Sequence, residues 1–491
     1  MNYAVVAKAL GGILMILGAA MLACFGLGWF EERFAGIEGS AAIGLLYGSL
    51  LTFSAGVVLR IFGHRGNALP LRKEAILIVG GGWILAGAFG AIPYLFGEVA
   101  LSPLQAYFES VSGFTTTGST VIGDLSVYPR SLLVWRSLTQ WLGGAGILVL
   151  FVALLYRSGT GSKSLFRQES SSREGDSFQA RTRVVAWTLW RLYLVLSLVC
   201  FVGLWVLGGD YYLALTHTLT TVSTGGFSPF NNSVSGFGNP LVEWWIIIFM
   251  AFGGISFMLM AFLLNRKWQR WVSDEETKVY LALLLVGTLV VSADLLWFID
   301  GIGVSEALRS AAFQVVSIMT TTGFVTRDYD QWPAFAQVVL VLLMFAGGCA
   351  GSTSGGIKVG RFVLLFKVTL QEIRKTIRPQ QVFPLSLNGQ TVSHSLVLQT
   401  LIFFALNGLL IAFGTLFVSL MEPHMDATDS FMSIVATLFN IGPGLGAVGA
   451  VQNFAHLDGI TLLVLSFYML LGRLELFAIL ALFVPSLWRK Y

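Results

Sequence analysis

The chain has 491 residues, of which 55% are hydrophobic and only 11% are charged. Soluble globular proteins carry about 25% charged residues, so this composition excludes a soluble globular class. The formal net charge of +4 is the sum of two oppositely charged surfaces. That pattern is a membrane-topology signal and does not indicate a nucleic-acid partner.

Ten apolar stretches are long enough to cross the hydrocarbon core of a bilayer, which takes about 20 residues. The first begins like a signal peptide, but its apolar run is too long and further spans follow, so we expect a retained helix. We predict an all-α integral membrane protein in the lipid bilayer, with about ten transmembrane helices. The stretches lie near 5–29, 41–62, 75–97, 132–156, 184–208, 240–264, 278–299, 335–370 (interrupted), 396–421 and 459–486.

Basic residues gather in every second connection between these stretches, and acidic residues gather in the others. By the positive-inside rule, the basic connections and both termini are cytoplasmic. Three cysteines show no metal-ligand spacing. No membrane-embedded His pair, GxSxG motif or paired Asp occurs at catalytic spacing, so we do not expect an enzyme.

A short cluster rich in Thr, Ser, Asn and Gly recurs four times, about a hundred residues apart, which indicates a repeated structural unit. The copies are TTTGST at 115–120, TVSTGGFS at 221–228, TTTGFVT at 320–326 and NIGPGLG at 440–446. One such cluster would be typical of a close helix–helix contact. Four in one context favour a cation filter, because glycine lets successive carbonyls turn to one side and replace the water shell of an ion. The glycines taken as equivalent are Gly118, Gly225, Gly323 and Gly442.

Before each cluster stands an apolar segment of about 10–15 residues, which is too short to span a bilayer. The segments are 103–114, 211–222, 305–319 and 427–439. We expect four re-entrant helices, whose turns must be buried in protein or line a water-filled path. Their C-terminal ends carry partial negative charge and would favour a cation where they converge.

These clusters and segments resemble those of the Trk/Ktr/HKT superfamily of potassium transporters, and the resemblance covers the whole chain. Within the superfamily, the chain is most similar to the bacterial TrkH/TrkG group. The resemblance implies four pseudo-symmetric helix–pore helix–helix units around one pore, in the bacterial cytoplasmic (inner) membrane. Two extra helices occupy 1–70, and the units occupy 71–160, 181–270, 275–380 and 392–491.

In this family each unit supplies one strand of a potassium filter with a central glycine. Relatives with Ser at the first of these positions are sodium-selective, so Gly118 indicates potassium. The resemblance assigns the filter, and with it the K⁺ sites, to Thr116, Thr117, Gly118, Val222, Ser223, Thr224, Gly225, Thr321, Thr322, Gly323, Asn440, Ile441 and Gly442. We expect Glu109 to orient the filter and His217 to be structural.

Six glycines between 345 and 361 argue against a continuous helix, since each costs about 1 kcal/mol in a helix interior. This break resembles the family's intramembrane loop, which obstructs the pore beneath the filter. The alternative is a close-packing kink, which we expect for the shorter glycine runs at 143–146 and 253–254. The resemblance assigns the gate to Gly347, Gly348, Gly351, Ser352, Thr353, Ser354, Gly355, Gly356, Lys358 and Arg473.

Arg473 lies in the middle of the last predicted span, where a charge is costly and usually faces the interior of the helix bundle. We expect it to face the pore below the filter, as the family's arginine does; the alternative is a pair with Glu475 or another acid. Its electrostatic obstacle and the steric obstacle of the loop should act partly independently.

The resemblance also implies a homodimer and a cytosolic TrkA-like nucleotide-binding regulatory subunit. The basic connections 157–183, 266–278 and 361–378 supply a docking face for that partner. The chain has no dinucleotide fingerprint or P-loop, so we expect ATP, ADP or NAD only on the partner and nothing beyond K⁺ on this chain.

The expected function is potassium uptake through a channel-like pore gated by the loop and the partner. The alternative is a symporter that couples potassium to protons or sodium by alternating access. Inverted repeats are the hallmark of that class, whereas these four units repeat in one orientation.

Overall fold

The computed structural model describes residues 1–66, 71–97, 100–158, 177–264, 266, 268–381 and 383–488. Within them, six helices are long and apolar enough to cross a membrane, or up to eight spans if each of two bent helix pairs is one span. The strands in this part of the chain are the antiparallel β1 (Ser386–Leu387) and β2 (Gln390–Thr391). The all-α membrane fold expected from composition is confirmed.

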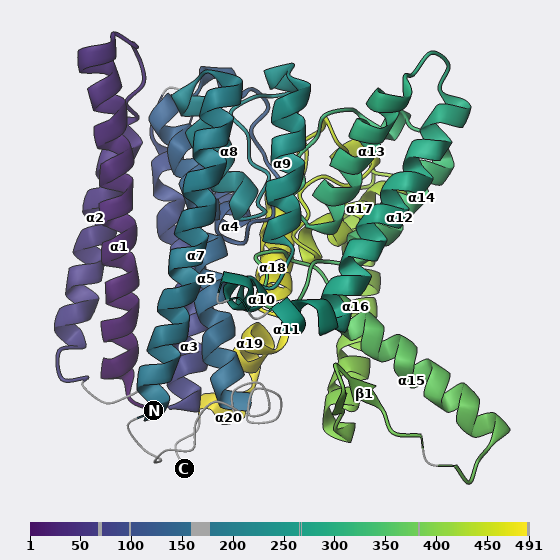
Figure 1. Cartoon of the computed structure of the whole chain (residues 1–491). Coiled ribbons are helices and arrows are strands. Elements are labelled where there is room, and N and C mark those ends of the chain that lie inside the picture. Colours follow the sequence, from purple (N-terminus) through teal and green to yellow (C-terminus); the bar gives the residue numbers. More distant parts are fainter. Residues whose placement is uncertain are drawn as a thin grey trace.

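The two N-terminal helices form an antiparallel pair at one edge of the molecule (Figure 1). They are α1 (Tyr3–Phe30) and α2 (Ile43–Phe62), with the π-helical turn η1 (Glu31–Ala35) between them. A Cβ on Gly11 would lie 2.6 Å from the carbonyl oxygen of Gly56, and a Cβ on Gly56 would lie 2.8 Å from that of Gly11. Small residues therefore let these two helices pack with their backbones close together.

Four units follow in the sequence, each with a short helix between longer segments. Unit one has α3 (Arg72–Gly90), η2 (Ile92–Leu95), α4 (Pro103–Phe114), η3 (Leu125–Val127) and α5 (Arg130–Ser158). Unit two has α7 (Ser177–Gly208), α8 (Tyr211–Val222), η4 (Ser233–Phe237), α9 (Pro240–Gly253), α10 (Phe257–Leu264) and α11 (Trp268–Ser273). Unit three has α12 (Glu275–Phe298), α13 (Val304–Met319), η5 (Tyr329–Gln331), α14 (Ala334–Phe345), α15 (Val359–Ile377) and the two strands. Unit four has α16 (His394–Met421), α17 (Ala427–Leu438), η6 (Gly446–Val448), α18 (Gly459–Arg473), α19 (Phe477–Leu480), η7 (Ala481–Phe483) and α20 (Pro485–Trp488).

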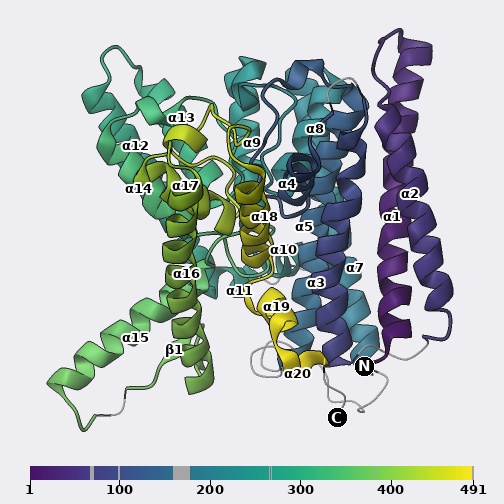
Figure 2. The same ribbon diagram turned by 180° about the vertical axis from the view of Figure 1, so that it is seen from behind.

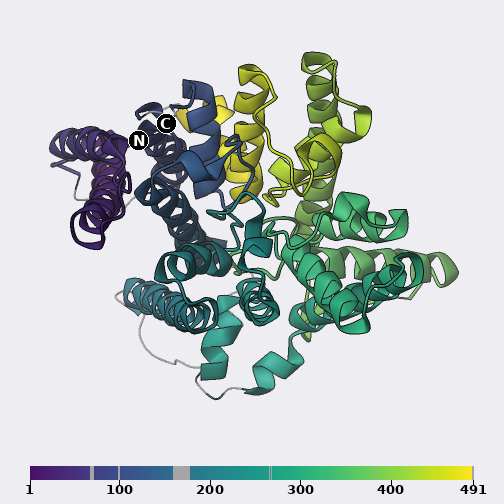
Figure 3. The same cartoon turned by 90° about the horizontal axis from the view of Figure 1, so that it is seen from above.

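Seen from above, the units occupy successive sectors around a common centre, and α1 and α2 stand outside them (Figure 3). From behind, α16 and α17 of unit four lie beside α12 to α14 of unit three, whereas α18 and α19 contact α4 and α3 of unit one (Figure 2). Both chain termini lie at the same end of the molecule, from which α15 projects away from the helix bundle (Figures 1 and 2). We refer to this as the terminal end.

The short helices α4, α8, α13 and α17 coincide with the four segments expected to be re-entrant. Ser102 starts α4 with a capping box to Gln105, and the Asp210 side chain accepts from two N–H groups at the start of α8. Such caps satisfy backbone donors that a helix end leaves free. The last half of each helix is buried, so each points its C-terminal end into the protein.

Two spans expected to be continuous are broken. The helices α9 and α10 meet at 101° after Gly253, and α18 and α19 meet at 112° after Arg473. The glycine run at 253–254, expected to be a close-packing kink, is therefore a sharp turn, whereas the run at 143–146 lies inside continuous α5. The interruption predicted in the eighth span separates α14 from α15.

Candidate functional site

Each short helix is followed by the same backbone turn. The second residue after the helix has φ between 52° and 56°, and two residues later a glycine has φ between 77° and 100°. The residues are Thr116, Thr224, Thr321 and Asn440, and the glycines are Gly118, Gly226, Gly323 and Gly442. A left-handed non-glycine residue costs about 1–2 kcal/mol. Four of them at equivalent positions mark a backbone conformation that the surrounding structure enforces.

In unit two, the choice of Gly225 as the equivalent glycine is wrong by one residue. The Gly225 N–H donates to the carbonyl of Thr220 at 2.8 Å, five residues earlier. The same bond in unit one joins the Thr117 N–H to Ser112 at 2.9 Å. Gly225 therefore corresponds to Thr117, and Gly226 is the glycine equivalent to those of the other strands.

The four glycine strands close into a ring. A Cβ on Gly442 would lie 2.8 Å from the carbonyl oxygen of Thr117, which directly precedes the glycine of unit one. Corresponding added Cβ atoms would meet the next strand in the other units: Gly118 against the Gly225 oxygen, Gly226 against Thr322 and Gly323 against Ile441. Because each strand touches the next and the fourth touches the first, the strands surround one axis. Both the positive φ and this close approach require glycine.

Hydroxyl groups in the clusters hold the turns. Thr115 Oγ1 donates to the Val111 carbonyl at 2.7 Å, and Thr320 Oγ1 donates to Val316 at the same distance. Each of these hydroxyls also lies 2.7 Å from that of the threonine two residues later. The first threonine of each of these two clusters therefore caps the C-terminal end of its short helix.

The remaining residues of the predicted filter lie at the helix ends or between strands. Val222 is the last residue of α8 and Ser223 is its C-cap, so both belong to the helix end. Asn440 Nδ2 donates to Thr117 Oγ1 and to the carbonyl of Met469, each at 2.9 Å. Asn440 thereby ties the strand of unit four to that of unit one.

A cavity of about 110 Å³ adjoins the ring on the side away from the terminal end. Its wall includes the four ring glycines, Arg136 and the loops that follow the strands. Small polar and backbone groups thus surround a space from which an ion could reach the ring.

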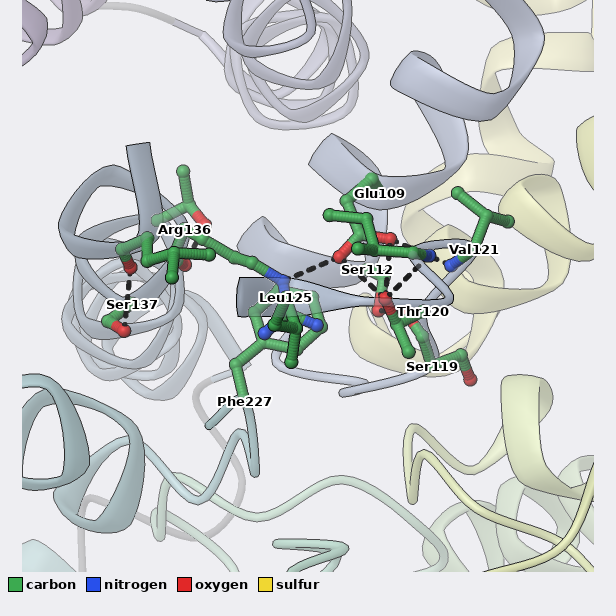
Figure 4. A network of polar contacts seen from close by, with 12 residues as sticks. Glu109, Ser112, Ser119, Thr120, Val121, Leu125, Arg136, Ser137 and Phe227 are labelled. Atoms are coloured by element: carbon green, nitrogen blue, oxygen red, sulfur yellow. Dashed lines mark hydrogen bonds and ion pairs between the residues drawn. The ribbon is translucent and has the colours of Figure 1, made fainter. Parts of the chain in front are cut away.

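A buried ion pair beside this cavity connects two strands (Figure 4). The Glu109 side chain is fully buried, accepts from Arg136 Nε at 2.6 Å and also accepts from Thr120 Oγ1 and the Val121 N–H. Arg136 donates to the carbonyl of Ser228 at 3.1 Å. Glu109 therefore holds the strand of unit one, and Arg136 holds that of unit two. Arg136 was not singled out from the sequence, although a charged residue inside the predicted span 132–156 could have indicated it.

His217 has the same place on α8 that Glu109 has on α4. Its Nδ1 donates to the Leu213 carbonyl at 2.9 Å, and its Nε2 lies 3.1 Å from Ser228 Oγ, which fits an acceptor role. Both ring nitrogens are therefore used within the protein, in keeping with a structural residue.

The segment between α14 and α15 forms a buried loop on the terminal side of the ring. Ser352, Thr353 and Ser354 are at most 3% exposed. Thr353 Oγ1 donates to the Val222 carbonyl at 3.2 Å, and the Gly355 N–H donates to Thr321 Oγ1 at 2.6 Å. The loop thus contacts the ends of α8 and α13 directly below the ring.

This loop is fastened to the other helix break. The Cys349 and Thr353 N–H groups donate to the carbonyls of Gly254 and Gly253, at 2.8 and 3.1 Å. Glu276 accepts from the N–H groups of Ala350 and Gly360, at 2.8 and 2.9 Å. Glu276 was not singled out from the sequence, because an acid at a helix start reads as an ordinary capping residue.

Arg473 is the last residue of α18, not the middle of a helix, and it is 2% exposed. Its Nη1 donates to the Thr353 carbonyl at 2.7 Å, so it is bound to the loop. The loop and Arg473, which we expect to act as partly independent obstacles, are thus joined by a direct hydrogen bond. The alternative pair with Glu475 is not formed, because Glu475 pairs with Arg361 at 2.5 Å.

A second cavity of about 40 Å³ adjoins the loop. Its wall joins loop residues to Lys358, Arg473 and Glu475. Lys358 Nζ donates to the carbonyls of Ser354 and Gly355. Two cationic side chains therefore stand at this cavity, both bonded to loop carbonyls.

Comparisons with known proteins agree with this architecture. The sequence profile of the TrkH family, described as cation transport protein, matches residues 46–490. The chain belongs to the TrkH family. The Trk system potassium uptake protein TrkH of Salmonella typhimurium is 37% identical over 85% of this chain and 86% of its own. The Trk system potassium uptake protein TrkG of Escherichia coli K12 is 33% identical, in an alignment that covers 86% of this chain and 87% of the TrkG chain.

A solved structure supports the same assignment. The crystal structure of the potassium transporter TrkH from Vibrio parahaemolyticus matches with a TM-score of 0.88 and 29% identity, covering 100% of both chains. The family resemblance drawn from the sequence is thereby confirmed, and the family is one of transporters.

Proposed function

We propose that this chain is a potassium uptake pathway whose ions pass through the ring formed by Gly118, Gly226, Gly323 and Gly442. The observation that carries the proposal is the ring itself: four left-handed turns, each ending in a glycine packed on the next strand. Carbonyl oxygens held in such a ring replace the hydration shell of a cation. The names of the Salmonella and Vibrio relatives support potassium as that cation.

The loop 346–358 and Arg473 serve as the gate of this pathway. The loop stands directly below the ring and is buried, and Arg473 adds a positive charge bonded to it. A cation leaving the ring toward the terminal end meets both. Opening requires breaking the bond between Arg473 and Thr353, displacing the Thr353 hydroxyl from the end of α8 and separating the Gly355 N–H from the Thr321 hydroxyl.

A TrkA-like nucleotide-binding partner acts from the terminal end, and the chain forms a homodimer in the bacterial inner membrane with both termini cytoplasmic. The projecting helix α15, with Arg374 and Lys375 in its last turn, offers the partner a basic surface. Most of the predicted docking segment 157–183 lies outside the described residues.

The test is ion flux into liposomes containing the purified protein, under separately imposed potassium, sodium and proton gradients. A pore moves potassium down its own gradient without a proton or sodium gradient; flux that requires one of them indicates the symporter. Gly118→Ser should raise sodium permeation relative to potassium, because a side chain there displaces the Gly225 carbonyl. Unchanged selectivity in that variant would remove Gly118 from the filter.

A further inference from the structure

One face of α5, from unit one, runs along the strand of unit two. Arg136, Gln140 and Gly144 are spaced four residues apart and so share this face. Arg136 donates to the Ser228 carbonyl at 3.1 Å, and its guanidinium lies 3.4 Å from the centre of the Phe227 ring. A Cβ on Gly144 would lie 2.9 Å from the Cβ of Ser223. The helix thus follows the strand from 223 to 228.

Gln140 is the residue of this face that reaches the ring. Its Nε2 donates to the Gly225 carbonyl at 2.6 Å, and its Oε1 accepts from the Phe227 N–H at 3.0 Å. The side chain is fully buried, and both its nitrogen and its oxygen have a hydrogen-bond partner. A single amide therefore brackets Gly226, the ring glycine of unit two, from both sides.

The other units have a different residue at this place. Gln140 stands three residues before Gly143, and the second helices of units two, three and four carry methionine three residues before a glycine. These residues are Met250, Met344 and Met469, and all three are fully buried. The glutamine is therefore specific to unit one.

The strand facing Gln140 is different in a matching way. The position before the ring glycine is Thr117, Thr322 or Ile441 in the other units, but it is Gly225 in unit two. A Cβ on Gly225 would fall on the amide group of Gln140. Unit two thus lacks a side chain where Gln140 requires space, so the two residues form a matched pair across the boundary between units.

We propose that Gln140 is a positioning residue that fixes the Gly225 carbonyl, and that this pair sets the preference of the pathway for potassium over sodium. The proposal rests on the proposed function. A carbonyl oxygen has two acceptor sites, so Gly225 can accept from Gln140 and still present a lone pair to an ion. The same oxygen packs on Gly118, so a shift of this carbonyl disturbs two strands of the ring.

The main variant is Gln140→Met, which gives unit one the residue of the other units and removes both hydrogen bonds. We expect the potassium-to-sodium permeability ratio, measured from reversal potentials under bi-ionic conditions, to fall about fivefold, as for one lost buried hydrogen bond. Met250→Leu is the matched control, because it changes the equivalent buried side chain without removing a side-chain hydrogen bond. Its ratio should stay within about twofold of wild type.

A second pair of variants tests the match itself. Gly225→Thr alone should lose potassium flux, since its side chain meets Gln140. Combined with Gln140→Met, it reproduces the Met250 and Thr322 combination of the next two units, and selectivity should recover to at least half the wild-type ratio. The proposed matching of the two residues is contradicted if the potassium-to-sodium permeability ratio of the double variant is no higher than the lower of the two single-variant ratios.

Gln140→Glu makes the permeability ratio depend on pH if Gln140 acts through its hydrogen bond, whereas a residue that only fills space would give no such dependence. An ionised carboxylate cannot donate to the Gly225 carbonyl, whereas a protonated one can. The permeability ratio of this variant should rise as the pH falls, while that of wild type stays level. A ratio independent of pH here, or a wild-type ratio in folded Gln140→Met, overturns the proposal. If wild type itself shows no potassium selectivity, the proposed function fails instead.

Discussion

Around the ring, the four units have one backbone turn in common, whereas on the terminal side their second helices continue in different ways. α5 passes straight through its glycines, α9 and α18 turn sharply, and α14 gives way to the buried loop. The residue after the shared glycine is Gly144, Gly254 and Gly348 in the first three units but Arg473 in the fourth. Symmetry thus belongs to the part that would bind an ion, and asymmetry to the part that would regulate its passage.

The largest expected effect comes from breaking the symmetric part. Gly226→Ala places a Cβ on the Thr322 carbonyl at a φ of 80°, so we expect potassium uptake to fall about a hundredfold or more, by analogy with a misplaced binding geometry. Gly225→Ala should lose less, because its φ is not positive and the atoms nearest to its Cβ belong to the Gln140 side chain rather than to the backbone of the next strand. Uptake by cells lacking their own potassium systems measures both; equal losses would contradict the register of unit two.

The register of the strand in unit two shows which features of the ring the sequence can predict and which it cannot. The clusters, the short helices and the ring glycines of units one, three and four could be predicted, because each depends on local sequence that repeats. Gly225 and Gly226 are adjacent and equally suited to a turn, so the pattern alone could not choose between them. The choice is made by the end of α8, where the Gly225 N–H bonds to Thr220.

The second prediction concerns the buried ion pair between Glu109 and Arg136, which connects the strands of units one and two. Glu109→Gln leaves Arg136 buried without its counter-charge, which costs about 3–5 kcal/mol of stability. Thermal unfolding in detergent, compared with wild type, measures the loss. Glu243→Gln removes a partly exposed pair with Arg309 and should cost about 1 kcal/mol or less. Similar losses of thermal stability in the two variants would mean that the buried Glu109–Arg136 pair stabilises the protein no more than the partly exposed Glu243–Arg309 pair does.

The third prediction concerns the loop and Arg473, which lie in the asymmetric part of the molecule. Arg473→Ala and deletion of 347–355 should each raise potassium flux several-fold in purified protein without a partner. Because Arg473 is bonded to Thr353, the combined variant should gain less than the product of the single gains, with a coupling of about 0.5–3 kcal/mol. Independent, multiplying gains would show that the arginine acts on the ion rather than through the loop.

The contacts of this loop could not be predicted from its glycines. Composition indicated a break in the helix, but the partners of the break lie far away in the sequence: Thr321 in unit three, Gly253 in unit two and Arg473 in unit four. A sharp turn after Arg473 was equally hidden, since the apolar run continues beyond it. Long-range pairing of backbone groups leaves no local signal in the chain.

The smallest effect concerns the far side of the ring, where units three and four meet. Tyr329 Oη donates to the Gly444 carbonyl at 2.8 Å, and the neighbouring Asp330 packs against Gly449. The pKa of Asp330 is raised to about 6, chiefly by burial and also by the nearby charges of Asp328 and Asp429, while a hydrogen bond from the Gly446 backbone lowers it.

A carboxyl whose pKa is higher in the folded state binds its proton more tightly there, so protonation favours the folded protein. Stability from this group is therefore greatest at low pH and is lost as the pH rises through about 6. We expect the melting temperature to rise slightly between pH 7.5 and pH 5, and the contribution of Asp330 to vanish in Asp330→Asn. Asp124→Asn is the control, because hydrogen bonds from Asn231 and Ser126 lower the pKa of Asp124 and keep it ionised across this range. An identical pH response in Asp330→Asn and wild type would show that the junction of units three and four does not sense pH through this carboxyl.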